Sequence, residues 1–162
     1  MDIRSVRNVV QVKVVLSATL TKVAAILDRQ SGWKTEDELI ATYALKVKLA
    51  CEYTTTELEA AQQLCEQIIG LPPPYAGSHP DEQLHKLFEL HARLESTSNI
   101  IEGLCESIQL LHDECENEEA MKEAQERAKD TLEGVEEASN TVPKIITEVQ
   151  KRILDQLIGP VV

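Results

Sequence analysis

The chain has 162 residues and a formal net charge of −12, and 43% of its residues are hydrophobic while only 3% are aromatic. The apolar content excludes a fully disordered chain, the shortage of aromatic residues argues against a β-sandwich or barrel, and the acidic balance argues against a free-standing nucleic-acid binder. The charge is uneven, because residues 1–30 carry +3, residues 31–79 carry −4 and residues 80–162 carry −11.

The first predicted helix covers about residues 5–29. Its apolar residues recur every three or four positions, which is typical of one buried helical face. They are Val9, Val12, Leu16, Leu20, Val23 and Leu27. Its many valines make a strand over residues 9–15 the local alternative, because β-branched side chains disfavour helix, but the sustained spacing favours the helix.

Polar residues interrupt the most apolar part of this first helix. Gln11, Lys13 and Ser17 break the run, so we expect neither a membrane span nor a secretory signal. The helix is also basic, through Arg4, Arg7, Lys13 and Lys22. Those side chains could meet a phosphate or an anionic membrane, but we interpret the helix as packing on the acidic second half of the chain or on a partner.

Residues 36–70 form the second predicted helix, which would be roughly 50 Å long at 1.5 Å per residue. Thr35 is a suitable N-cap, Glu38 completes a capping box with it, and Gly70 ends the helix. The predicted apolar stripe consists of Leu39, Tyr43, Lys46 or Val47, Ala50, Tyr53, Glu57, Ala61, Leu64 and Ile68.

The segment 71–80 is the one clear linker, because its consecutive prolines cannot continue a helix and Gly77 with Ser78 can turn the chain. We interpret it as a rigid connector between antiparallel helices. Its Pro-Pro-Pro-Tyr string, residues 72–75, leaves open a proline-motif ligand that an aromatic-lined groove would bind.

The third predicted helix begins near residue 80 and carries the strongest pattern in the chain. Apolar residues keep strict three- and four-residue spacing over more than three heptads, which is typical of a coiled-coil seam. We predict an interaction seam formed by Leu87, Leu90, Leu94, Ile101, Leu104, Ile108 and Leu111. A polar line runs beside it, through His91, Ser98, Cys105 and His112.

The region 113–137 holds eleven acids and three bases. Two alternatives are open here: one helix over residues 80–137, or a break near residues 113–118. The acidic helix is either a solvated helix with a narrow contact stripe or a docking surface for a basic partner. Residues 139–143, Ser-Asn-Thr-Val-Pro, predict a second boundary. The last predicted helix then covers 142–158, and its apolar face is Val142, Ile145 or Ile146, Val149, Ile153 and Leu157.

The four cysteines, Cys51, Cys65, Cys105 and Cys115, are interpreted as reduced, small apolar residues, although an even count allows two disulfides. We expect no metal and no cofactor, because zinc needs four close ligands and only one Glu-x-x-His pair, residues 82–85, is present of the two that a di-iron bundle needs. The sequence also lacks a nucleophile elbow and a phosphate-binding glycine loop. No catalytic residue is therefore assigned.

Together the patterns predict an all-α fold: an elongated antiparallel bundle of three to four long helices with coiled-coil character, in one unit over residues 1–162. We expect a non-catalytic protein-interaction or assembly subunit, a scaffold or adaptor in the cytoplasm or nucleus. It would bind a protein partner, or itself, by burying helix faces. The alternatives are a bundle that carries a lipid or other apolar ligand, which would need an internal cavity, and a metal-dependent bundle enzyme.

Overall fold

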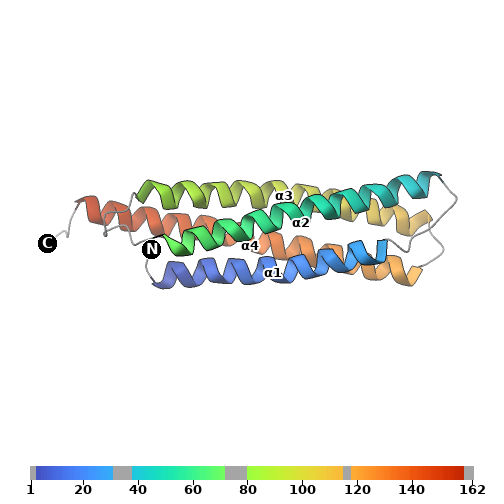
Figure 1. The fold of residues 1–162 in the computed structure, drawn as a ribbon, viewed down its shortest axis with the longest axis horizontal. Helices are drawn as coiled ribbons and strands as arrows, with labels where there is room; N and C mark the ends of the chain where they lie inside the picture. The colour runs from blue at the N-terminus through green and yellow to red at the C-terminus, as the bar shows by residue number, and fades with distance from the viewer. Residues whose placement is uncertain (1–2, 31–37, 72–79, 115–117, 159–162) are drawn as a thin grey trace.

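A computed structural model describes residues 3–30, 38–71, 80–114 and 118–158 of the chain. It contains four long helices (Figure 1): α1 (Ile3–Gln30), α2 (Glu38–Gly70), α3 (Pro80–Glu114) and α4 (Glu118–Ile158). The predicted all-α antiparallel bundle is confirmed, with four helices. The predicted linker, apart from Leu71 and Pro80, and the predicted cap Thr35 lie outside the described residues.

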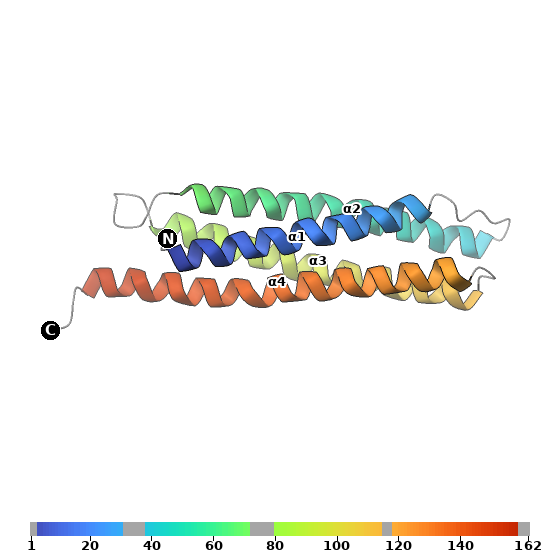
Figure 2. The ribbon, with the colours of Figure 1, turned by 90° about the horizontal axis from the view of Figure 1, so that it is seen from below.

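Consecutive helices run in opposite directions, and the four together form an elongated bundle (Figure 2). Each helix packs against two neighbours: α1 contacts α2 and α4, and α3 contacts α2 and α4. The helices therefore form a closed ring in chain order around one shared core. Each helix of this kind is hydrophobic along one stripe. The bundle buries all four stripes at once because each of them faces the shared core.

The core is built from residues at alternating three- and four-residue steps on every helix, so each helix contributes one continuous stripe. The largest fully buried side chains come from three helices and are Leu16, Ile26, Leu58, Ile68, Leu87, Leu90, Leu94, Ile101, Leu104 and Ile108. The fourth helix, α4, contributes smaller residues, among them Ala124, Ala128 and Ala138. Toward its C-terminus α4 also buries Ile145, Ile146 and Val149, so its core face combines small and larger side chains.

The core stripe of α2 differs from the predicted one. The buried residues are Ala44, Val47, Cys51, Thr54, Leu58, Ala61, Leu64, Cys65 and Ile68. Tyr53 was predicted to be buried but is half exposed, and Tyr43, Ala50 and Glu57 are only partly buried. The predicted stripe omitted Cys51, Thr54 and Cys65, although the cysteines were interpreted as small apolar residues, and these three complete the regular spacing.

Each helix places one fully buried threonine in the core: Thr19, Thr54, Thr97 and Thr131. Counted from Ser5, Ile68, Gln83 and Ile145, the threonine occupies the fifth core level of its helix, with Leu64 and Cys65 taken as one level of α2 and with Val149 one level beyond Ile145 on α4. The register therefore places the four threonines in one cross-section of the bundle, a polar layer between apolar layers. A buried polar layer is a known way to fix the register of packed helices.

Three of the four threonine hydroxyls donate a hydrogen bond to a carbonyl three or four residues earlier in their own helix, at 2.7–2.8 Å. The Oγ1 of Thr54 is buried without a hydrogen-bond partner among the described residues. Thr54→Val is therefore expected to raise the free energy of unfolding by about 1–2 kcal/mol, because a buried hydroxyl without a partner carries its full desolvation cost. Urea unfolding measures this. Thr131→Val is the matched control and should be neutral or destabilising, since it removes an existing bond; equal effects at the two positions would contradict the assignment.

The predicted boundary at residues 139–143 is wrong, because α4 runs unbroken through Pro143. Proline inside a helix removes one backbone hydrogen bond and costs roughly 3 kcal/mol. The buried positions nevertheless continue across it at regular spacing, through Ala138, Val142 and Ile145. The packing of this stripe on α1 and α3 holds the helix together where the local sequence alone predicts a stop.

The break near residues 113–118 is the alternative that the structure shows, since α3 ends at Glu114 and α4 begins at Glu118. Residues 115–117 lie outside the described ranges. The predicted single helix over 80–137 is thus two antiparallel helices. The first helix agrees with its predicted range of 5–29 to within two residues.

Candidate interaction surface

The predicted interaction seam on α3 lies inside the bundle. Six of its seven residues are fully buried against the other helices of the same chain: Leu87, Leu90, Leu94, Ile101, Leu104 and Ile108. The side chain of Leu111 lies outside the described ones. An intermolecular role for this seam stays a prediction, and in the folded chain it would require helices to exchange between copies.

The basic first helix packs against acidic partners within its own chain. Lys13 Nζ lies 3.0 Å from a carboxylate oxygen of Glu66 on α2. On the other side, Lys22 lines a groove between α1 and α4 with Asp130, Glu133 and Glu137. Two basic residues of α1 thus lie beside acidic side chains of α2 and α4 in the same chain.

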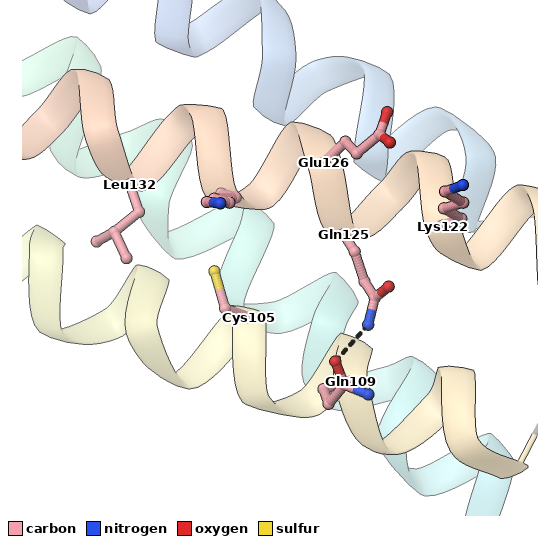
Figure 3. Close-up of a pocket in the computed structure, with 7 residues that line it drawn as sticks. Cys105, Gln109, Lys122, Gln125, Glu126 and Leu132 are labelled. Atoms are coloured by element: carbon pink, nitrogen blue, oxygen red, sulfur yellow. Dashed lines mark hydrogen bonds between the residues drawn. The ribbon is translucent and has the colours of Figure 1, made fainter.

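A second groove, of about 460 Å³, lies between α3 and α4 (Figure 3). Its lining consists of Cys105, Gln109, Lys122, Gln125, Glu126, Lys129 and Leu132. Gln125 donates a hydrogen bond to Gln109 at 2.6 Å, and this bond joins the two helices across the groove. Both grooves lined by described residues open at the surface, whereas a lipid carrier would need an enclosed apolar chamber.

The cysteines behave as apolar side chains. Cys51, Cys65 and Cys105 are free thiols, as predicted, while Cys115 lies outside the described residues. Burial raises the pKa of Cys51 and of Cys65 to about 12. Burial, with the nearby carboxylates Glu102 and Glu106, also raises the pKa of Cys105. A nucleophilic cysteine needs a lowered pKa, whereas burial acts on these three thiols in the opposite direction.

The polar line beside the seam occupies the side of α3 that faces α4. His91, Ser98 and Cys105 are partly buried there, and His91 pairs with Glu95 at 3.1 Å on its own helix. Within the described part of the chain, no three His, Cys, Asp or Glu side chains are grouped closely enough to hold a metal ion. The line is thus a set of residues flanking the core, and the side chain of His112 lies outside the described ones.

The large apolar side chains that the core leaves out gather most densely on α2. Leu45, Leu49 and Tyr53 follow one another at four-residue steps and are 52%, 55% and 50% exposed. We name these three residues the α2 ridge. Four-residue steps form one of the ridges along which helices pack against other helices. No charged residue interrupts the ridge itself, but Lys46 and Glu52 flank it.

Sequence reasoning missed the α2 ridge because it assigned Tyr53 to the core and gave Leu45 and Leu49 no role. A signal was present in the sequence. The α2 residues at alternating three- and four-residue steps from Ala44 to Ile68 occupy one complete face of the helix. The apolar residues outside that set therefore had to lie on another face.

The segment Arg4–Asp28 of α1 is long and apolar enough, by length and composition, to cross a membrane, and its most apolar stretch of 18 residues has a mean hydropathy of 1.6. The core helix of a bundle and a signal sequence share these properties. In the bundle, one third of this stretch is buried against α2 and α4. The expected absence of a membrane span stays a prediction.

No family model matches the chain, and comparisons with curated proteins and with solved structures found no significant match.

Proposed function

We propose that this protein is a non-catalytic assembly subunit, a scaffold or adaptor, that binds through the outer face of α2. The α2 ridge is the observation that carries the proposal: three large apolar side chains, each about half exposed, at the spacing used for helix packing. Soluble bundles place polar residues at such outward positions, and exposed apolar groups with a regular arrangement mark interaction sites. The acidic α3 and α4 would then contribute orientation and partner selection rather than affinity.

The binding mode would be helix against helix. The ridge runs along a rigid helix whose inner face is fixed by the core, so binding requires little reordering of the chain. Because the seam on α3 is buried within the bundle, the α2 ridge replaces it here as the proposed contact surface. The protein would act by burial of this helix face, without a cofactor or catalytic group.

The proposal is tested by substituting residues of the α2 ridge and measuring which co-purifying proteins are lost. Tagged full-length protein is compared with the double variant Leu45→Glu/Leu49→Glu and with Gln63→Glu, an outward-facing position two heptads further along α2. Proteins that co-purify with the wild type and with Gln63→Glu should be lost from the double variant, while circular dichroism shows all three chains equally helical. If the three folded chains retain the same proteins, the α2 ridge is not the contact surface and the proposal is wrong.

A further inference from the structure

The start of α1 and the end of α4 lie at the same end of the bundle (Figure 2). The groove between these antiparallel helices fixes their register, because Ala18 of α1 and Glu137 of α4 both line it. Seven residues make about two helical turns, so the same edge continues to Arg4 on α1, and to Lys144 and Lys151 on α4. The register thus brings basic residues of two helices together at one end of an acidic protein.

Four exposed bases form this cluster, which we name the basic end patch: Arg4, Arg7, Lys144 and Lys151. None of them forms an ion pair with another described residue. Glu148 and Asp155 are interspersed with the patch on α4, so bases still outnumber acids there. Arg4 lies in the first turn of α1, where a positive charge opposes the helix dipole. The stability of α1 therefore does not account for this arrangement.

The outer face of α1 continues from the patch without a charge. Every exposed residue between Arg7 and Asp28 is uncharged, and α1 has no acidic residue before Asp28. Val10 and Val14 are the large apolar side chains of this face, 43% and 56% exposed. Only a third of the most apolar stretch of α1 is buried, so the core does not account for its apolar character. Bases beside an uncharged, partly apolar face are typical of helices that lie in the membrane interface.

We propose that the basic end patch and the adjoining outer face of α1 dock the bundle onto the surface of an anionic lipid bilayer. The contact is peripheral, because α1 stays packed in the bundle. It does not involve the α2 ridge and therefore goes beyond the proposed function. Clustered bases bind the anionic lipids of a cytoplasmic leaflet through its negative surface potential. Val10 and Val14 enter the boundary between headgroups and acyl chains, a contact that a soluble polyanion does not offer.

The remaining charge sets the orientation of the docked molecule. Asp130, Glu133 and Glu137 lie further along the edge between α1 and α4, beside Ala18. Ala18 is 14 residues from Arg4, roughly 21 Å of helix at 1.5 Å per residue. An anionic surface repels these carboxylates, so the bundle tilts with its basic end toward the bilayer. The Debye length is only about 8 Å at physiological ionic strength, so a modest tilt removes most of this repulsion while the patch stays in contact.

Vesicle flotation of the full chain tests the proposal. The protein should float with vesicles that contain about 30% phosphatidylserine but not with pure phosphatidylcholine vesicles. Arg4→Glu/Arg7→Glu should weaken binding about tenfold or more, because each base near the surface contributes to the attraction. Lys122→Glu/Lys129→Glu makes the same change in net charge at exposed positions near the other end of α4 and should bind within about twofold of the wild type. No binding, binding that ignores vesicle charge, or equal losses in the two variants overturns the proposal.

The two valines distinguish a bilayer from a soluble anion. Val10→Gln/Val14→Gln keeps the charge but removes the apolar contact, so vesicle binding should weaken about threefold or more. Leu110→Gln, at an exposed apolar position of α3, is the matched control and should bind like the wild type. Circular dichroism should show equal helical content in all chains. A valine variant that binds as well as the wild type overturns the proposal.

Two further outcomes separate this inference from other occupants of the same face and from the proposed function. If the wild type ignores vesicles but forms a dimer in sedimentation that Val10→Gln/Val14→Gln abolishes, a second copy covers the face and the bilayer is excluded. The ridge variant Leu45→Glu/Leu49→Glu should still float with anionic vesicles, because the α2 ridge lies outside the basic end patch. Its loss of vesicle binding with the helical content intact would place the lipid contact on α2 and overturn the inference.

Discussion

Replacing Leu94 and Ile101 together with aspartate is expected to leave the chain unfolded. Both side chains are fully buried in the centre of the bundle, two of the large residues that α3 contributes to the core. Each substitution forfeits about 2–5 kcal/mol of apolar packing and adds the cost of a buried carboxylate without a partner. A domain of this kind has only about 5–15 kcal/mol of total stability. Far-UV circular dichroism and urea titration should show loss of helix and of the cooperative transition.

The controls for this prediction come from the exposed face of α2. Leu49→Asp introduces the same carboxylate into the same kind of helix, but Leu49 is more than half exposed, so its stability should change by less than about 1 kcal/mol. If the Leu94/Ile101 double variant keeps the helical content and oligomeric state of the wild type, then α3 does not supply the core of the bundle.

Alanine is expected to have opposite effects at the two glycines inside α3 and α4. A Cβ at Gly103 meets no atom within 4 Å, so Gly103→Ala should stabilise the protein by about 0.5–1 kcal/mol, the usual helix-propensity gain. A Cβ at Gly134 would collide with Cγ2 of Thr19 on α1. The Thr19 side chain is buried and its hydroxyl donates to the carbonyl of Leu16, so it cannot move freely. Gly134→Ala should therefore lose about 1–2 kcal/mol through overpacking.

A second substitution isolates the cause. Thr19→Ser keeps the hydroxyl but removes the methyl group that the new Cβ would meet. Gly134→Ala should therefore be less costly in the Thr19→Ser background, which thermal or urea unfolding of the four chains measures as a coupling energy. If Gly134→Ala stabilises the wild-type background as much as Gly103→Ala does, then α1 and α4 do not approach as closely as the structure shows.

Much of the fold followed from the sequence. The regular spacing on residues 80–111 predicted a buried stripe, and its six described residues lie in the core. The ranges of α1 and α2 were predicted to within about two residues, and the all-α class followed from composition and periodicity. The continuity of α4 through Pro143 did not follow, because the cost of an internal proline is local whereas the packing that offsets it comes from distant helices.

The candidate surface was the part least predictable from the sequence. On α2 apolar residues lie on more than one face, and the stripe predicted from their spacing contained Tyr53 but neither Cys51 nor Thr54. Only the joint packing of four helices decides which stripe points inward, and it selected the stripe in which Cys51 and Thr54 align with the buried rows of the other helices.

The sequence by itself determined that this protein is a bundle of long helices, because a helical period of 3.6 residues is written directly into the spacing of its apolar residues. The tertiary structure decided which apolar residues are buried in the core of the bundle and which stay exposed. In the tertiary structure the seam residues of α3 are buried in the core, whereas Leu45, Leu49 and Tyr53 lie on the exposed face of α2. The physical reason is that the rotation of each helix about its own axis is set by the need to bury the apolar stripes of all four helices together. That rotation depends on how the four helices pack and cannot be derived from one helix alone.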